Sequence, residues 1–390
     1  MAPNIRLYNT ESRRVEDLTE PEIGLYVCGV TPYDTSHLGH AFTYVMFDVL
    51  IRFLRFCGRR VTYVQNVTDI DDDVLLRAGK LGEDWQALGN REYASFRDQM
   101  STLGNLDPDV APRATQHIPE MLEIVQGLIA KGFAYENEGS VYFEVAKDDN
   151  FGRLFHEPYQ AMLEIANERG NFPADPLKHD PLDFVLWQHQ KPGEPKWDSL
   201  WGPGRPGWHI ECSAMAIKYL GQTVTIHGGG EDLIFPHHDA EIAQSEGSSG
   251  VRFVRHWMHT GMVYCGEHKM SKSLGNMVFV ADLLKRYSSD ALRLHLLSHP
   301  YARPWDHPQG VAVPTEALSL SLTKAFADAG DATLDEIVQY SGDFENALAN
   351  DLNTVAAIRA LEALAGSNDP AALRAGKALS QRVLGLSLRW

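Results

Sequence analysis

Short apolar runs rich in β-branched residues alternate with longer amphipathic stretches in the first two-thirds of the chain. Residues 25–30 (LYVCGV) and 61–67 (VTYVQNV) each predict a buried strand, and the apolar-periodic stretch 42–56 between them predicts a helix. Further strands are expected at 139–145 and 223–227. This rhythm of strand, helix and strand is typical of an α/β protein with a parallel sheet.

Helical spacing dominates two other parts of the chain. Residues 85–135 predict helices, and Pro236 predicts the first turn of another helix, because proline suits that position. From 158 to 207 the composition shifts to proline, glycine, tryptophan and charge, which indicates a partly irregular insertion. After Pro308 the chain is rich in alanine and leucine at helical spacing, which predicts a helical bundle.

The composition excludes several protein classes. The chain has 390 residues, of which 44% are hydrophobic and 22% charged, as in globular proteins of two or three domains. Neither a transmembrane helix nor a secretory signal is expected, so the sequence favours the cytoplasm. A net charge of −17 argues against general nucleic-acid binding but leaves room for a local basic groove. Four cysteines are too few for a disulfide scaffold, and neither Cys57 nor Cys265 suggests a role beyond a buried thiol.

Two motifs carry chemistry suited to phosphate. His37-Leu38-Gly39-His40 lies at a predicted strand-to-helix junction, where free N–H groups and the helix dipole favour a phosphate chain. Lys269-Met270-Ser271-Lys272-Ser273 occupies a predicted loop, where two lysines could hold a triphosphate. Taken separately, the histidines could be structural and the lysines part of a solvated loop.

The ordered pair of motifs resembles the HIGH and KMSKS signatures of class I aminoacyl-tRNA synthetases. That resemblance implies a Rossmann-like catalytic domain that makes an aminoacyl adenylate from ATP with magnesium. His37 and His40 would then steady the α-phosphate, while Lys269 and Lys272 would hold the pyrophosphate that leaves. Further contacts to ATP or the adenylate are implied for Gly29, Thr31, Gly39, Gly229, Gly230, Asp232, Val263, Ser271 and Ser273.

A third group of residues suggests a metal site. Cys28, Cys212, His237 and Glu241 offer two thiolates, an imidazole and a carboxylate, which together suit zinc. Each could also be an ordinary core or surface residue. The segments WHIECSA and HGGGEDLIFPHH around them closely resemble cysteinyl-tRNA synthetases, in which zinc reads the substrate thiol. The resemblance also implies that Thr68 and Trp208 contact L-cysteine.

The acceptor of the activated cysteine is less clear from the sequence. Two relatives share this core: cysteinyl-tRNA synthetase, which acylates tRNA(Cys), and the mycothiol cysteine ligase, which acylates the amine of glucosaminyl-inositol. Only 117 residues follow Ser273, residues 309–390 hold 6 Lys and Arg against 10 Asp and Glu, and the segments 30–41 and 162–173 resemble the ligase. These features favour the amino-sugar as acceptor, although Glu241 and the segment 239–246 resemble the synthetase.

Other readings stay open beside this expectation. The chain could be a compact cysteinyl-tRNA synthetase, or a paralogue that transfers cysteine to another amine, including a carrier protein. It could also be a nucleotidyltransferase of the same superfamily or a non-catalytic relative. In each case we expect a Rossmann-like domain over 1–275 with an insertion around 85–205. A connecting, stem-contact-like segment would follow at 276–310 and a helical bundle at 311–390, with no separate anticodon-binding domain.

Overall fold

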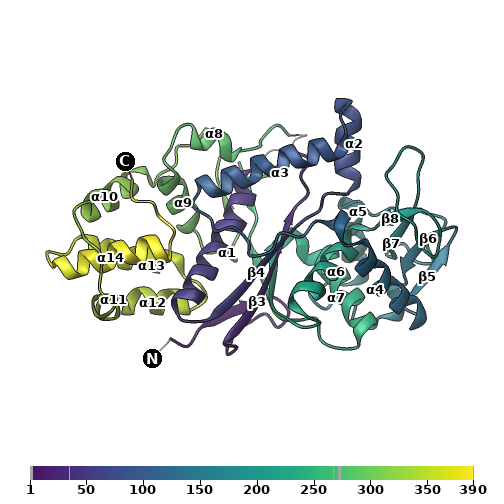
Figure 1. Ribbon diagram of the computed structural model, residues 1–390, viewed down its shortest axis with the longest axis horizontal. Helices are drawn as coiled ribbons and strands as arrows, with labels where there is room; N and C mark the ends of the chain where they lie inside the picture. Colours follow the sequence, from purple (N-terminus) through teal and green to yellow (C-terminus); the bar gives the residue numbers. More distant parts are fainter. Residues whose placement is uncertain (1–2, 35, 267, 271–273, 309, 390) are drawn as a thin grey trace.

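A central parallel sheet organises the molecule. The computed structural model describes every residue except 1–2, 35, 267, 271–273, 309 and 390. Its four central strands follow the order β10–β9–β3–β4, and every neighbouring pair is parallel. The strands are β3 (Glu22–Val30), β4 (Arg60–Val67), β9 (Val224–Gly230) and β10 (Val254–Thr260). The predicted α/β class with a parallel sheet is therefore confirmed, and Figure 1 shows the sheet between a helical lobe and a mixed lobe.

Helices cover both faces of this sheet. Helix α1 (Leu38–Phe56) packs on one face, against β4, β9 and β10, and α6 (Trp208–Leu220) packs on the other, beside α7 (Asp239–Ser249). Helix α1 is buried on most of its circumference, because α9 (Ser289–Leu297) covers the side that faces away from the sheet. The carboxyl end of β3 and the first turn of α1 are thereby held in a fixed relation.

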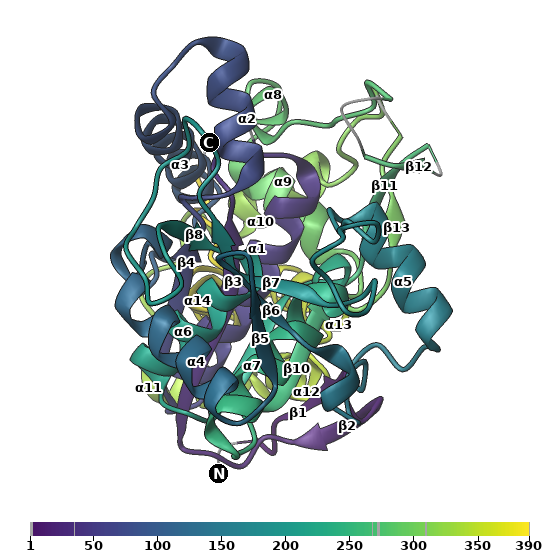
Figure 2. The same ribbon diagram turned by 90° about the vertical axis from the view of Figure 1, so that its right-hand side faces the viewer.

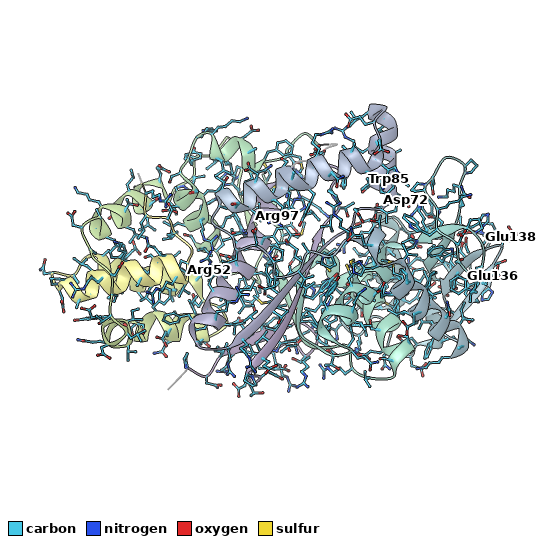
Figure 3. All side chains as sticks on the ribbon, in the orientation of Figure 1. Arg52, Asp72, Trp85, Arg97, Glu136 and Glu138 are labelled. Carbon is cyan, nitrogen blue, oxygen red and sulfur yellow. The ribbon has the colours of Figure 1, made fainter. Side chains whose placement is uncertain are left out.

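The C-terminal helices continue the core on the outer side of α1. Asp48 of α1 is buried and accepts hydrogen bonds from Arg52 Nε (2.8 Å), from the N–H of Leu106 (2.8 Å) and from buried Arg293 of α9. Arg52 is labelled in Figure 3. Five further helices complete this lobe: α10 (Glu316–Phe326), α11 (Leu334–Tyr340), α12 (Gly342–Ala349), α13 (Thr354–Ala365) and α14 (Pro370–Arg382).

The insertion between β4 and α6 forms the opposite lobe. It contains an antiparallel sheet, β5–β6–β7–β8, and Figure 2 brings this lobe in front of the central sheet. Its strands are β5 (Ala134–Asn137), β6 (Ser140–Phe143), β7 (Phe184–His189) and β8 (Gly204–Pro206). Helices α4 (Ile118–Ala130) and α5 (Tyr159–Glu168) belong to this lobe. Helices α2 (Asp72–Leu81) and α3 (Trp85–Thr102) of the same insertion do not, because α3 packs against α1, where the Phe96 and Tyr44 ring centroids lie 5.2 Å apart.

Two details differ from the sequence expectations. Residues 85–135 are not helical throughout, because the chain between α3 and α4 contains Pro108 and Pro112 and runs beside β4. The helix expected from Pro236 starts irregularly: Phe235 just before it has extended torsion angles (φ −135°, ψ 138°), residues Ile234–His238 form a π-helical turn, and the regular helix α7 starts at Asp239.

Small elements complete the described chain. A hairpin of β1 (Arg6–Asn9) and β2 (Arg14–Asp17) precedes the sheet, and α8 (Val280–Leu284) precedes α9. Strands β11 (Val263–Cys265), β12 (His268–Lys269) and β13 (Trp305–Asp306) form a third sheet. Within the described residues, every helix is too short or too polar to cross a membrane.

Candidate active site

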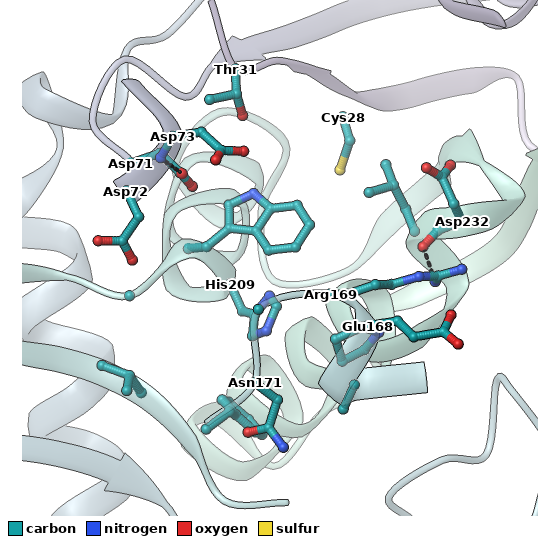
Figure 4. A pocket seen from close by; sticks show the side chains of 18 of the residues that line it. Cys28, Thr31, Asp71, Asp72, Asp73, Glu168, Arg169, Asn171, His209 and Asp232 are labelled. Atoms are coloured by element: carbon teal, nitrogen blue, oxygen red, sulfur yellow. Dashed lines mark hydrogen bonds between the residues drawn. The ribbon is translucent and has the colours of Figure 1, made fainter. Parts of the chain in front are cut away.

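The carboxyl ends of β3 and β9 open into a cavity of about 1460 Å³. This is the edge of a parallel α/β sheet at which ligands usually bind. Many of the residues singled out from the sequence line it: Cys28, Gly29, Thr31, His37, Gly39, His40, Trp208, Gly230, Asp232, Val263 and Lys269. Figure 4 shows Asp71, Asp72 and Asp73 on one side of the cavity and Asp232 on the other, with Cys28 near its inner wall. The fold thus brings His37 and His40 of the first predicted phosphate motif and Lys269 of the second to one cavity.

The two histidines of the first motif stand together at the start of α1. His37 caps the helix in an extended conformation, and its Nδ1 accepts a hydrogen bond from the N–H of Gly39 at 3.1 Å. The His37 and His40 rings stack with centroids 3.8 Å apart. A Cβ on Gly39 would lie 3.0 Å from the His37 ring, so glycine lets the ring fold over the helix start. The pair therefore presents imidazole nitrogens beside a helix N-terminus, which suits an anionic phosphate.

The second motif is only partly described. Lys269 belongs to β12, is exposed and lines the cavity, so its ammonium group has access to a ligand there. Ser271, Lys272 and Ser273 lie outside the described residues. Their predicted contacts with phosphate stay predictions.

Close backbone contacts shape the floor of the cavity. The N–H of Gly29 donates to Asn66 Oδ1 at 2.8 Å, and a Cβ on Gly29 would lie 1.6 Å from the Asn66 carbonyl oxygen. A Cβ on Gly230 would lie 2.5 Å from Asp232 Oδ1, so the Asp232 carboxylate sits directly over this glycine. Gly229 is packed behind them, against Leu233 and Cys28. Only glycine permits this approach of carboxylate and backbone.

Four buried donor groups meet behind the cavity wall. Cys28 Sγ lies 3.8 Å from Cys212 Sγ and 3.7 Å from Glu241 Oε1, and His237 Nε2 lies 3.2 Å from the same oxygen. One ligand atom from each of Cys28, Cys212, His237 and Glu241 lies within 4.8 Å of all the others. Strand β3 carries Cys28, α6 carries Cys212, the turn before α7 carries His237, and α7 itself carries Glu241.

The chemistry of this set fits a divalent cation. Burial raises the pKa of the Cys28 thiol and of the Glu241 carboxyl, and burial lowers the pKa of His237. Glu241 Oε2 is buried without a hydrogen-bond partner. A bound metal ion would stabilise the thiolate, the carboxylate and the neutral imidazole, and would thereby offset the loss of hydration that burial imposes on these groups.

Further histidines adjoin the set and were not singled out from the sequence; one of them is His209, whose Nδ1 lies 2.9 Å from Nδ1 of His237. His227 Nε2 and His238 Nε2 lie 3.5 and 3.3 Å from Cys28 Sγ, so Cys28, His227, His238 and Glu241 form an overlapping group of candidate ligands. His238 Nδ1 lies 2.7 Å from His259 Nε2, and His259 Nδ1 lies 2.8 Å from Thr10 Oγ1. His227 and His259 belong to β9 and β10, whereas His238 belongs to the turn before α7, so these positions share no simple sequence pattern.

Of the two residues predicted to contact cysteine, Trp208 lies beside the metal set. The Trp208 ring stacks on the His237 ring with centroids 4.2 Å apart, and Trp208 lines the cavity. Thr68 is buried at the end of β4, where its Oγ1 accepts a hydrogen bond from Asn66 Nδ2 at 3.2 Å. An amino acid whose side chain reached the metal set would therefore pass beside the indole.

Comparison with known proteins places this architecture in a family. Residues 14–312 match the family described as tRNA synthetases class I (C) catalytic domain. A protein from Dehalococcoides mccartyi named cysteine–tRNA ligase is 43% identical, over 98% of this chain and 87% of that protein. Another of that name, from Thermodesulfovibrio yellowstonii, is 48% identical over 77% of this chain and 62% of its own length.

The chain belongs to the cysteine–tRNA ligase family of class I synthetases. It is accordingly a ligase with a class I catalytic domain. Among solved structures, Mycobacterium tuberculosis methionyl-tRNA synthetase in complex with methionyl-adenylate has a TM-score of 0.68 at 15% identity. That match covers 94% of this chain and 92% of the other and concerns the fold alone.

The family assignment corrects the expected acceptor. The sequence analysis favoured an amino-sugar amine, as in the mycothiol cysteine ligase. The reported relatives of this chain are named cysteine–tRNA ligase and are 43–48% identical to it. Sequence identity over most of the chain outweighs the similarity of two short segments to the ligase and the acidic composition of the C-terminal residues. The amino-sugar function and the assignment to mycothiol biosynthesis were wrong.

Proposed function

We propose that this protein charges tRNA(Cys) with L-cysteine. The observation that carries the proposal is the buried set of Cys28, Cys212, His237 and Glu241 directly behind a cavity that is lined by His37, His40 and Lys269. The cysteine–tRNA ligase relatives support tRNA as the acceptor. The chain's own residues would bind ATP and cysteine at adjoining places in the cavity.

The set of four buried ligands would hold zinc. Two thiolates, one imidazole and one carboxylate form a four-coordinate donor set typical of this ion. Bound zinc would coordinate the thiol of cysteine and thereby discriminate against the hydroxyl of serine, which is a poorer zinc ligand. Trp208 would pack against the substrate side chain, and Thr68 would help to fix its position.

Adenylate formation then needs positioning and charge neutralisation. A carboxylate oxygen of cysteine attacks the α-phosphorus of ATP, the bond to the β-phosphate oxygen breaks, and magnesium pyrophosphate leaves. His37 and His40 would donate hydrogen bonds at the α-phosphate, and Lys269 and Lys272 would neutralise the leaving group. Asp232 would hold the ribose hydroxyl or the amino group, while Gly29, Thr31, Gly39, Gly229, Gly230, Val263, Ser271 and Ser273 would line the nucleotide.

In the second step a terminal hydroxyl of tRNA attacks the adenylate carbonyl. The carbonyl–phosphate bond breaks, AMP leaves, and the hydroxyl proton is released. We propose that residues 1–275 perform this chemistry, while the segment 276–310 and the bundle 311–390 contact the tRNA.

The experiment for this proposal measures cysteine-dependent exchange of labelled pyrophosphate into ATP, with serine in place of cysteine as the control. We expect exchange with cysteine at least about 100-fold faster than with serine, because the site rejects an analogue that cannot make its central bond. Equal exchange with both amino acids, or none with cysteine, would overturn the proposal.

A further inference from the structure

A half-buried arginine from the insertion enters the cavity beside the adenylate-binding turn. Arg169 follows α5 and lines the cavity. Its Nη1 donates hydrogen bonds to two main-chain carbonyl oxygens, those of Asp232 and Phe235. Figure 4 shows the guanidinium reaching toward Asp232. Arg169 therefore holds both ends of the turn that connects the glycines of β9 to the metal-ligand helix.

The position of this arginine differs from that of most others in the described chain. Arg153, for example, pairs bidentately with Glu246 at 2.8 and 2.6 Å. Among the described residues, Arg169 has no ion pair, and it donates its hydrogen bonds to carbonyl oxygens. Burial lowers its pKa, and the negative charge of Asp232 opposes this effect. Burial of the Arg169 guanidinium costs hydration, so we expect this side chain to serve the site and not merely to keep the surface soluble.

The turn that Arg169 grips carries groups of both substrate sites. Asp232 lies at its start, with its carboxylate over Gly230, and His237 lies two residues beyond its end, 3.2 Å from Glu241. The insertion also holds the turn elsewhere: the Phe155 ring stacks on Phe235 with centroids 5.1 Å apart. The main-chain N–H groups of Leu154 and Phe155 each donate to the Asp239 carboxylate at 3.0 Å. Of these contacts between the insertion and the turn, the one made by Arg169 is the contact with the main chain of Asp232.

We propose that Arg169 is a positioning residue for adenylate formation, which aims the Asp232 carboxylate at the nucleotide by binding the main chain of the 232–235 turn. The insertion thereby sets the geometry of the activation site. Its removal lets the turn relax, so that Asp232 points away from its partner on the substrate. This inference rests on the proposed activation of cysteine.

The test compares Arg169→Ala with a matched arginine away from the cavity. Arg59 Nη1 also donates to two carbonyl oxygens, those of Thr19 and Glu20, at 3.1 and 2.9 Å. Pyrophosphate exchange is measured for wild type, Arg169→Ala, Arg169→Lys and Arg59→Ala, together with zinc content and thermal midpoint. We expect Arg169→Ala to lower kcat/KM for ATP by about 10- to 100-fold with zinc content unchanged, because a misplaced group costs about that much. Arg59→Ala should keep wild-type exchange.

Two readouts separate positioning from a merely structural role. Arg169→Lys should recover part of the loss, since an ammonium group can still bind these carbonyls, and it is the variant to measure if Arg169→Ala does not fold. In an Asp232→Ala background, Arg169→Ala should add little further loss. Both changes act through the same contact, that of the Asp232 carboxylate with the nucleotide. Full additivity of the two losses, or exchange by Arg169→Ala equal to that of Arg59→Ala, would overturn the inference. A wild-type protein without cysteine-dependent exchange would instead overturn the proposed function.

Discussion

The sulfur atoms of Cys28 and Cys212 lie 3.8 Å apart, although the residues are 184 positions apart in the chain. The two side chains come from β3 and α6, and each is buried. Two thiols at this distance, beside His237 and Glu241, make the most specific feature of the site. Under the proposed function, their closeness would be the structural basis for selecting a thiol substrate.

Replacing one of these sulfurs should remove the metal and the selectivity together. We predict that Cys212→Ser lowers zinc content from about one ion per chain to near zero and abolishes preferential activation of cysteine, because a serine hydroxyl is a poor zinc ligand. Elemental analysis and pyrophosphate exchange measure the two effects. The control is Cys57→Ser, since Cys57 is only partly buried and lies outside the candidate ligand groups. Full zinc content in Cys212→Ser would contradict the assignment.

Substitution of Gly230, beside Asp232, should lower activity without lowering stability. A Cβ at Gly230 would lie 2.5 Å from Asp232 Oδ1, and this side chain can move away. Gly230→Ala should therefore fold normally but slow exchange by about 10-fold or more, as expected for a displaced contact group. Gly79→Ala is the control, because nothing lies within 4 Å of that Cβ and the residue is in α2. Unchanged exchange in Gly230→Ala would remove Asp232 from the site.

A buried ion pair joins the catalytic domain to the C-terminal helices. Asp48 contacts Arg293, which is fully buried, and also Arg52 at 2.8 Å. We predict that Asp48→Ala lowers the free energy of unfolding by about 3–5 kcal/mol, because it leaves buried Arg293 without its carboxylate. The control is Glu22→Ala in the Glu22–Arg60 pair, whose side chains are 67% and 80% exposed. That variant should cost about 0–1 kcal/mol in urea unfolding, and similar losses in both variants would contradict the prediction.

A neutral buried histidine should make the protein sensitive to acid. Burial lowers the pKa of His295 from 6.5 to about 3, with neighbouring His299 and His307 adding to the effect. The unfolded chain binds a proton at His295 below about pH 6.5, whereas the folded protein does not until about pH 3. The stability is therefore present above pH 6.5 and falls as the pH drops, by up to about 1.4 kcal/mol per pH unit.

Substitution of His295 isolates this effect. His295→Gln should flatten the dependence of the free energy of unfolding on pH between 6.5 and 4 by close to one proton, since an amide does not titrate there. The matched variant is His268→Gln, because His268 is exposed. If His295→Gln and wild type lose stability in parallel on acidification, His295 is not the group responsible.

The sequence predicted the parallel part of the fold better than the antiparallel part. Residues 25–30 and 61–67 are continuous apolar runs, and the structure has β3 and β4 there. The strand β10 was missed because VRHWMHT is interrupted by charged and imidazole side chains. The insertion sheet was reduced to one expected strand, since short strands such as β8 depend on partners distant in sequence.

The site could be predicted where residue type alone restricts the chemistry. Cys28 and Cys212 were singled out from four cysteines because the segments WHIECSA and HGGGEDLIFPHH resemble cysteinyl-tRNA synthetases, and in the structure these two sulfurs lie 3.8 Å apart. Arg169 was not found, because its contacts are to main-chain carbonyls, which leave no trace in the sequence. The acceptor was predicted wrongly because the amine and the hydroxyl follow the same adenylate chemistry, and nothing in the activation site distinguishes them.

The most direct measurement is the transfer of labelled cysteine to tRNA. Purified protein with ATP, magnesium and cysteine would be given tRNA(Cys), or another tRNA as control, and cysteine esterified to the 3′ end would be counted. Charging of tRNA(Cys) alone, abolished by periodate oxidation of its terminal ribose, is the predicted result. Cysteine-dependent pyrophosphate exchange without any charged tRNA(Cys) would contradict the account, because the adenylate would then serve a different acceptor.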